Sequence, residues 1–274
     1  MLILPAIDLL EGRCVRLRQG KFDAVTVYSD DPVAVARGFV ERGATALHVV
    51  DLEGARLGRA RNLEWVFQIR AAVPAFLQVG GGIRTFAAAA RLLEGGVDRI
   101  VIGTAAAEDA RLLEKCLETY GPDYVAAALD LRDGRLAVRG WTEIADRSAE
   151  EVADALAAAG VRWLVVTDVT RDGTRAGPAL DAAARLVARG FRVIAAGGIA
   201  SAKDVADLRR VGAAGCVIGS ALYEGTLRLE DALAAARGPG AFGDRDPQAR
   251  EPEGPERADD ARARDEPGGR EPCA

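Results

Sequence analysis

The sequence is poor in histidine, paired cysteines and long apolar runs, and each scarcity excludes a class of protein. It contains a single histidine, His48, and four cysteines, none of them in CxxC spacing. A zinc site is hard to assemble from that set, so we expect no metal and no cofactor, and the reduced thiols of a cytoplasmic protein. No stretch approaches the roughly 18 apolar residues of a membrane span, so no membrane partner is expected.

A surplus of basic residues is also missing. The 36 Lys and Arg residues against 41 Asp and Glu residues give a net charge of −5, which offers no positive field to nucleic acid. Hydrophobic residues make up 49% of the 274, enough for one large domain with a sizeable core. From about residue 238 the chain turns to Pro, Gly and alternating charges. We therefore expect residues 1–237 to form the domain and 238–274 a disordered tail without catalytic work.

Short β-branched runs alternate with Ala, Leu and Arg segments of helical period, which indicates repeated βα units around a parallel sheet. Eight runs are predicted strands: residues 2–8, 46–51, 76–80, 98–103, 124–130, 162–167, 192–196 and 214–219. The predicted helices include 31–42, 85–94, 148–159 and 201–210, each opening with Asp, Thr or Ser as a candidate N-cap. Eight near-equal units favour a closed (β/α)8 TIM barrel over a doubly wound open sheet, the competing α/β fold.

The second half of the chain repeats the first. The segments PAID, VVD, VGGGIR and VIGT return in the same order as AALD, VTD, AAGGIA and VIGS. The offsets are nearly constant: 130 − 8 = 122, 168 − 51 = 117, 197 − 81 = 116 and 220 − 104 = 116. A constant shift in four ordered places predicts two duplicated half-barrels of four βα units each.

Glycine pairs and hydroxyls recur where the repeated strands end, and in a TIM barrel these strand ends line the active site. A lone glycine pair would more often mark a tight turn. Glycine also lets an anion approach backbone N–H groups closely, and a helix that begins there adds partial positive charge. We therefore predict one phosphate site in each half, and a long substrate with a phosphate at each end. The candidates are Gly81, Gly82, Gly103 and Thr104, then Gly197, Gly198, Gly219 and Ser220.

Two aspartates, Asp8 and Asp130, end the first and fifth predicted strands, so the duplication places them on opposite sides of one mouth. A general acid and a general base acting on one substrate are commonly such a pair of carboxyl groups. The alternative role of a strand-end aspartate is to cap the following turn. We assign a structural or orienting role to Asp51 and Asp168, which also end strands.

Five further residues are candidates for substrate contact. His48 lies in the second predicted strand, where a structural role is equally open. Arg18, Arg84 and Asp172 lie in or near loops, where Arg is often solvated surface and Asp-Gly an ordinary turn. Trp141 follows the fifth strand and could stack on a planar ring.

The order and spacing of several motifs resemble those of the phosphoribosylformimino-5-aminoimidazole carboxamide ribotide isomerases of histidine biosynthesis. The motifs include PAIDLLEGRCVRLRQG, LHVVDLEGA, QVGGGIR, ALDLRDGRLAVRGW, TDVTRDGTRAGP and VIGSALYEG, and the resemblance covers most of residues 1–237. It implies an Amadori rearrangement of an aminoaldose with two ribose-phosphate arms to the aminoketose. It further implies Asp8 as proton acceptor, Asp130 as proton donor, Thr167 as an assisting group and Trp141 stacked on the imidazole carboxamide. We expect the enzyme to be a monomer.

Three other activities stay open. The cyclase of the next pathway step is a homologous barrel with the same aspartates and phosphate sites. That family typically begins with Cys-Leu-Asp and has a lysine in the first loop, whereas this chain has Ala6, Ile7 and Asp8, with Arg16 and Arg18 in the loop. A dual-substrate isomerase would also convert phosphoribosylanthranilate by the same chemistry. A non-catalytic phosphate-binding barrel would have no need for both Asp8 and Asp130.

Overall fold

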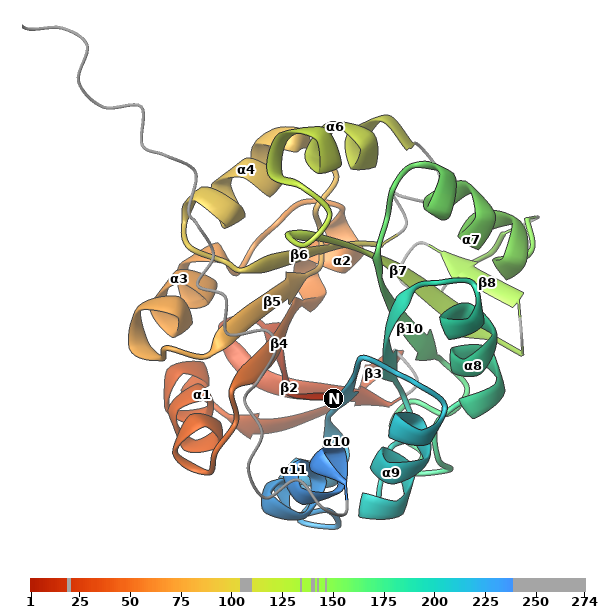
Figure 1. The fold of residues 1–274 in the computed structure, drawn as a ribbon. Coiled ribbons are helices and arrows are strands. Elements are labelled where there is room, and N and C mark those ends of the chain that lie inside the picture. Colours follow the sequence, from red (N-terminus) through yellow and green to blue (C-terminus); the bar gives the residue numbers. More distant parts are fainter. Residues whose placement is uncertain are drawn as a thin grey trace, which may run out of the picture. The chain divides into compact units, whose positions relative to one another are not determined.

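Eight parallel strands close into a barrel in the computed structural model of the chain, and helices surround them in a ring (Figure 1). The structure describes residues 1–18, 21–103, 110–133, 135–138, 141, 143–145 and 147–238. Around the barrel the strand order is β1, β4, β5, β6, β7, β10, β11 and β12, and β12 pairs with β1 to complete the circle. The predicted (β/α)8 TIM barrel is confirmed.

Each of the eight predicted strands forms within two residues of its expected ends. They are β1 (Leu2–Leu10), β4 (Ala46–Asp51), β5 (Phe76–Gly80), β6 (Arg99–Ile102), β7 (Val125–Arg132), β10 (Trp163–Asp168), β11 (Arg192–Ala196) and β12 (Gly215–Ile218). Parallel barrel strands are buried on both faces, so they appear in a sequence as short, nearly continuous apolar runs. That local signal explains why the strands were predictable.

The helices that follow the strands begin at the predicted caps. The side chains of Asp31, Thr85, Ser148 and Ser201 each accept a hydrogen bond from a backbone N–H of the first helical turn. The helices are α1 (Pro32–Glu41), α2 (Leu52–Leu57), α3 (Leu63–Ala72), α4 (Phe86–Glu94), α6 (Ala110–Tyr120), α7 (Ala149–Ala158), α8 (Leu180–Ala188), α9 (Ala202–Arg210), α10 (Ser220–Tyr223) and α11 (Leu229–Arg237).

Alternation along the strands produces two apolar layers. On β1, Leu4 and Ala6 point into the barrel, where they join a cluster with Val165 and Ile194. The intervening residues of the strands, such as Ile7, pack outward against the helices in a larger cluster. The inner layer fills the barrel below its mouth, so the carboxyl ends of the strands are left to line a site.

Two antiparallel hairpins extend the mouth, and their strands were not predicted. β2 (Arg13–Arg18) and β3 (Lys21–Ser29) fold back on β1, with Val15 opposite Asp8. β8 (Arg135–Val138) and β9 (Glu143–Ile144) fold back on β7, with Ala137 opposite Asp130. These short strands mix charged and apolar residues and lack the apolar runs that marked the barrel strands. Each half of the molecule thus has a hairpin beside its strand-end aspartate.

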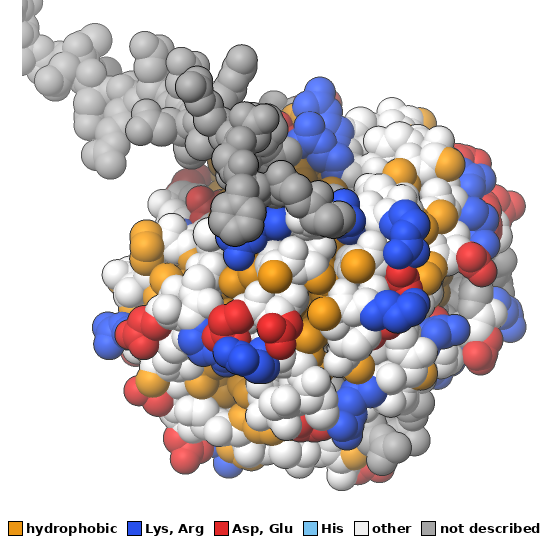
Figure 2. All heavy atoms as spheres, turned by 60° about the horizontal axis from the view of Figure 1, so that its bottom comes forward, with side chains coloured by type: hydrophobic (Ala, Val, Ile, Leu, Met, Phe, Trp, Pro, Cys, Tyr) orange, Lys and Arg blue, Asp and Glu red, His pale blue; other side chains and the backbone are white. Residues whose placement is uncertain are grey.

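The outer surface carries charges of both signs. On the face drawn in Figure 2, acidic and basic side chains of described residues are interspersed among apolar atoms. In the described part of the chain, no helix is long and apolar enough to cross a membrane. The last described helix, α11, ends at Arg237, and the predicted tail lies outside the described residues from residue 239 onward.

Candidate active site

Asp8 stands near the carboxyl end of β1, against an arginine of the first hairpin. Nη1 of Arg16 lies 2.6 Å from Oδ2 of Asp8, and Nη2 of Arg16 donates to the Ala6 carbonyl at 3.3 Å. Because Asp8 is only 8% exposed, burial raises the pKa of its carboxyl, while the charge and hydrogen bond of Arg16 lower it. The net direction is a raised pKa, and Arg16 favours the ionised form of the Asp8 carboxyl against the effect of burial.

Asp130 stands at the equivalent place on β7, and its hydrogen-bond partners are neutral. Thr167 on β10 is in register with Asp130, and the side chains of Trp141 and Thr167 hydrogen-bond to the carboxyl. Burial raises the pKa of Asp130, and these two hydrogen bonds do not cancel that rise. Asp130 consequently keeps its proton to a higher pH than an ordinary carboxyl, and no arginine among the described side chains lies against it to favour the ionised form.

A third carboxyl group, that of Asp172, reaches the same space from the loop after β10. Burial raises the pKa of Asp172 to about 6; Arg16 opposes this rise, and the charges of Asp8 and Asp130 add to it. A carboxyl with this pKa changes between its protonated and ionised forms close to neutral pH. Within the described ranges, no group of three or more His, Cys, Asp or Glu side chains is arranged to hold a metal ion.

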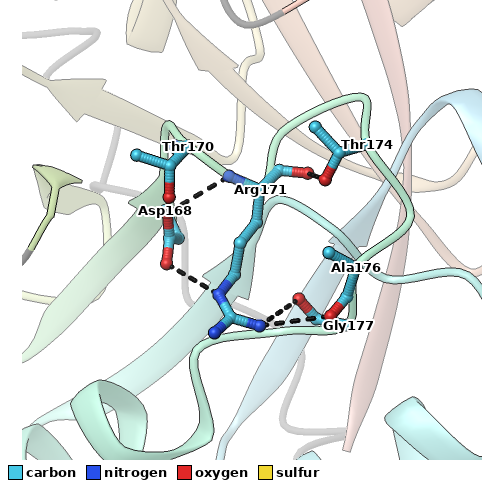
Figure 3. Close-up of polar contacts among 6 residues, drawn as sticks. All are labelled: Asp168, Thr170, Arg171, Thr174, Ala176 and Gly177. Atoms are coloured by element: carbon cyan, nitrogen blue, oxygen red, sulfur yellow. Dashed lines mark hydrogen bonds and ion pairs between the residues drawn. The ribbon is translucent and has the colours of Figure 1, made fainter.

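Arg171 fixes the shape of the loop after β10 (Figure 3). Nε of Arg171 lies 3.1 Å from Oδ2 of Asp168, and Nη1 donates to the carbonyls of Ala176 and Gly177 at 3.2 and 3.3 Å. Oδ1 of Asp168 also accepts from the backbone N–H of Arg171 at 3.2 Å. Asp168 thus has the orienting role that its strand-end position suggested, and the loop holds Asp172 at the mouth.

Two pockets open at the mouth, and the larger is lined by residues of the first half together with Asp130, Trp141, Thr167 and Asp172 of the second half. It comprises about 1120 Å³ of space, open solvent at its entrance included. Apolar side chains such as Leu52 and Ile83 form part of its wall, and Arg56 adds a cation. The pocket brings together ten of the residues singled out in the sequence: Asp8, His48, Gly81, Gly82, Arg84, Gly103, Asp130, Trp141, Thr167 and Asp172.

A smaller pocket of about 460 Å³ adjoins it in the second half. Its wall includes Asp172, which also lines the larger pocket, and two arginines, Arg16 and Arg175. Nε of Arg16 is buried and has no hydrogen-bond partner among the described residues. The four candidates from the second half of the sequence, Gly197, Gly198, Gly219 and Ser220, all line this pocket.

The packing of the protein chain by itself already requires the glycine pairs. Gly81 and Gly197 have φ angles of 100° and 87°, which side-chain-bearing residues rarely adopt. An added Cβ would also collide with backbone atoms of the preceding βα loop, in matching positions of the two halves: Gly81 against Asp51, Gly82 against Gly54, Gly197 against Asp168, and Gly198 against Gly177. Substitution here would therefore disturb the loops before it affected any ligand.

His48 lines the larger pocket and ends a chain of buried polar side chains. Nε2 of Gln78 lies 2.9 Å from Nδ1 of His48, and Nη1 of Arg99 lies 3.4 Å from Oε1 of Gln78. Burial, with a smaller contribution from the charge of Arg16, lowers the pKa of His48 to about 4, so the ring is neutral at neutral pH. The sequence left open whether His48 has a structural role or contacts the substrate. In the structure His48 is both hydrogen-bonded to Gln78 and part of the wall of the larger pocket.

Two candidates from the sequence fall outside the description, and three residues of the site were missed. Thr104 lies outside the described residues, and of Arg18 only the backbone, at the end of β2, is described. The missed residues are Arg16, Arg175 and Gln78. Gln78 had a usable signal, because it is a polar residue in the middle of an otherwise apolar predicted strand. Arg16 shares its motif with Arg18, and no pattern marked Arg175.

A family profile described as "Histidine biosynthesis protein" matches residues 2–228. A relative from Moorella thermoacetica is 49% identical over 241 residues, which are 86% of this chain and 98% of the relative. A relative from Thermomicrobium roseum is 48% identical over 232 residues, which are 84% of this chain and 95% of the relative. Both relatives are named 1-(5-phosphoribosyl)-5-((5-phosphoribosylamino)methylideneamino)imidazole-4-carboxamide isomerase.

Proposed function

The chain belongs to the histidine biosynthesis protein family, and we propose that it is an isomerase that converts the aminoaldose named in its relatives into the corresponding aminoketose. Such an enzyme is an intramolecular oxidoreductase, because one carbon of the sugar is oxidised as its neighbour is reduced. The observation that carries the proposal is the pair Asp8 and Asp130, which share one pocket but have opposite neighbours: an arginine for Asp8 and neutral donors for Asp130.

Asp130 has the properties of the general acid. Ring opening of the aminoaldose requires a proton on the ring oxygen as the furanose becomes an imine. A carboxyl can supply this proton only if it is still protonated near neutral pH, and burial raises the pKa of Asp130 in that direction. Thr167 and Trp141 hold the carboxyl in place through their hydrogen bonds. Trp141 also lines the larger pocket, where its indole can stack on a planar ring of the substrate.

Asp8 has the properties of the general base. After ring opening, the proton on C2′ must be removed so that the imine becomes an enolamine, from which the ketose forms by tautomerisation. The base must be ionised to accept this proton, and the Arg16 guanidinium at 2.6 Å favours that form. One carboxyl thus gives a proton and the other takes one, so the isomerisation needs no metal, oxidant or reductant.

The two pockets match a substrate with a phosphate at each end. In the larger pocket, the backbone at Gly82 and Gly103 and the side chain of Arg84 are available to one phosphate. In the smaller pocket, Arg16 and Arg175 with the backbone at Gly219 and Ser220 are available to the other. Asp8 and Asp130 then lie beside the sugar that connects the two ends.

A soak with sulfate or phosphate is expected to place one anion in each pocket. Arg84→Ala should weaken the anion of the larger pocket, and Arg175→Ala that of the smaller one, because each removes a cation from the wall. Crystallographic occupancy measures both effects. Arg185→Ala is the matched control, since Arg185 lies on α8 outside both pockets with a 58% exposed side chain. Anions bound in one half only would contradict a two-phosphate substrate.

The activity itself is tested by an assay of the purified chain on the aminoaldose, with the aminoketose as the measured product. We expect turnover without added metal or cofactor. Absence of turnover in folded protein would refute the proposal. Phosphoribosylanthranilate, assayed in parallel, measures the dual-substrate alternative, and the aminoketose with ammonia measures the cyclase alternative.

A further inference from the structure

The two half-barrels differ inside the barrel at one set of equivalent positions. In the first half, His48 on β4, Gln78 on β5 and Arg99 on β6 are in register and point into the barrel. The same register in the second half joins three residues without polar side chains: Val165, Ile194 and Gly215. The offsets are 165 − 48 = 117, 194 − 78 = 116 and 215 − 99 = 116, the same as those of the sequence repeat.

The barrel therefore does not need a polar row at this level in order to fold. Buried polar groups lose hydration, and an apolar set of similar shape is commonly no less stable. His48, Gln78 and Arg99 are only 7%, 0% and 4% exposed, and they form a continuous hydrogen-bonded chain. Arg99 is held in turn by the Asp123 carbonyl at 3.0 Å and by the ring of Trp163, whose centroid lies 3.6 Å from its guanidinium carbon.

The donor and acceptor atoms allow the hydrogen bonds from Arg99 through Gln78 to His48 to run in only one direction. Arg99 can only donate, so the oxygen of Gln78 must face it and the amide nitrogen of Gln78 must face His48. The amide nitrogen also can only donate, so Nδ1 of His48 must accept and therefore carries no proton. In the neutral ring the proton is then on Nε2, the nitrogen that Gln78 leaves free on the wall of the larger pocket.

We propose that Gln78, aligned by Arg99, is a positioning residue that holds His48 as the neutral Nε2–H tautomer, so that His48 donates a hydrogen bond to an oxygen of the substrate. This inference rests on the proposed function. A substrate with two similar phosphoribosyl arms could enter the mouth in either direction, and the aligned positions of the second half, Val165 and Ile194, offer no such donor. The His48 N–H thus distinguishes one arm from the other.

The tautomer is directly measurable because His48 is the only histidine of the chain. Protein labelled with 15N in the imidazole ring, with any histidine tag removed, gives the two-bond N–H couplings of a single ring. At pH 7 we expect a neutral ring protonated on Nε2. An Nδ1–H ring or an imidazolium at pH 7 would overturn the proposal. This result does not depend on turnover, so it is distinct from a failure of the proposed function.

Gln78→Glu reverses the direction of the hydrogen bond between residue 78 and His48 while keeping the shape of the side chain. The carboxylate still accepts from Arg99, but it now also accepts from His48, which moves the neutral-ring proton to Nδ1 and turns a lone pair towards the substrate. We expect the NMR pattern to invert and kcat/KM at neutral pH to fall about 10-fold or more, the loss of a substrate hydrogen bond with repulsion added. Unchanged kcat/KM in folded Gln78→Glu that shows the inverted pattern would refute the substrate contact.

A pH profile separates this role from a merely structural one. The added carboxylate raises the pKa of His48, which Arg16 on β2 opposes, and a doubly protonated ring again has Nε2–H. The ratio of the kcat/KM of Gln78→Glu to that of the wild type should therefore rise as pH falls. Gln78→Met, which cannot hold either tautomer, should show reduced kcat/KM with no such rise. A ratio that is flat with pH in Gln78→Glu would contradict the proposal.

Discussion

Asp8→Asn and Asp130→Asn are each expected to lower kcat at least about 100-fold, because general acid or general base catalysis is typically worth that much. Asparagine keeps the shape of aspartate, but its amide neither accepts nor supplies a proton near neutral pH. Both side chains line the pocket, and the substitutions leave its arginines, Arg56 and Arg84, in place, so the Kd of the substrate should change little. Steady-state kinetics and equilibrium binding measure the two quantities separately.

Asp154→Asn is the matched control for this pair, because Asp154 lies on α7 with a 68% exposed side chain, away from the mouth. Near-normal turnover in Asp8→Asn would remove Asp8 from the mechanism as the base. Retained turnover in Asp130→Asn would transfer the acid role to Asp172, the other carboxyl of the mouth, whose pKa is raised to about 6. The double variant Asp130→Asn with Asp172→Asn then measures that alternative.

Arg16→Met is expected to lower kcat/KM at pH 7 at least about 10-fold and to move the acidic limb of the pH profile to higher pH. Burial raises the pKa of Asp8, and Arg16 is the group that opposes it. Without the guanidinium the pKa of Asp8 rises further, and one unit of pKa corresponds to a tenfold change in the ionised fraction below it. A base acts in its ionised form, so activity is lost as pH falls through its pKa, and that loss now begins at higher pH.

The defect of Arg16→Met should therefore be largest at low pH and shrink as pH rises. A second, pH-independent rise in KM is expected because Arg16 also lines the smaller pocket. Arg16→Lys keeps the positive charge but not the planar guanidinium. It should therefore return the acidic limb of the pH profile most of the way to its wild-type position, while KM returns less of the way to its wild-type value. An acidic limb that stays in place in Arg16→Met would show that Arg16 does not set the ionisation of the base.

Local signals in the sequence were enough for the barrel. Parallel strands buried on both faces produce short apolar runs, and the caps of the helices are single residues such as Thr85 and Ser148. The mouth hairpins were missed because their pairing partners are β1 and β7, at strand ends where the sequence has no apolar run. Their positions follow from register, which no short window of sequence contains.

The glycine pairs were located correctly from the sequence, but the backbone packing that requires glycine there is visible only in the structure. The repeat marked Gly81 and Gly197 as strand-end residues, and they do lie at the two pockets. A Cβ at these positions would collide with the backbone of Asp51 in one half and of Asp168 in the other, so glycine is required there whether or not a ligand binds. A contact between two loops far apart in the sequence has no signature within either loop.

The sequence by itself determined the eight-stranded barrel, its duplication and the placement of Asp8 and Asp130 at the mouth, because periodicity, strand ends and a constant offset are properties of the chain. Only the tertiary structure decided which aspartate has an arginine against it and which side of the barrel has a fixed imidazole N–H. Ionisation and tautomer depend on burial and on neighbours through space. Arg16 contacts Asp8 from the paired strand of the hairpin, and Gln78 contacts His48 from the neighbouring barrel strand, so both contacts are set by register and not by local sequence.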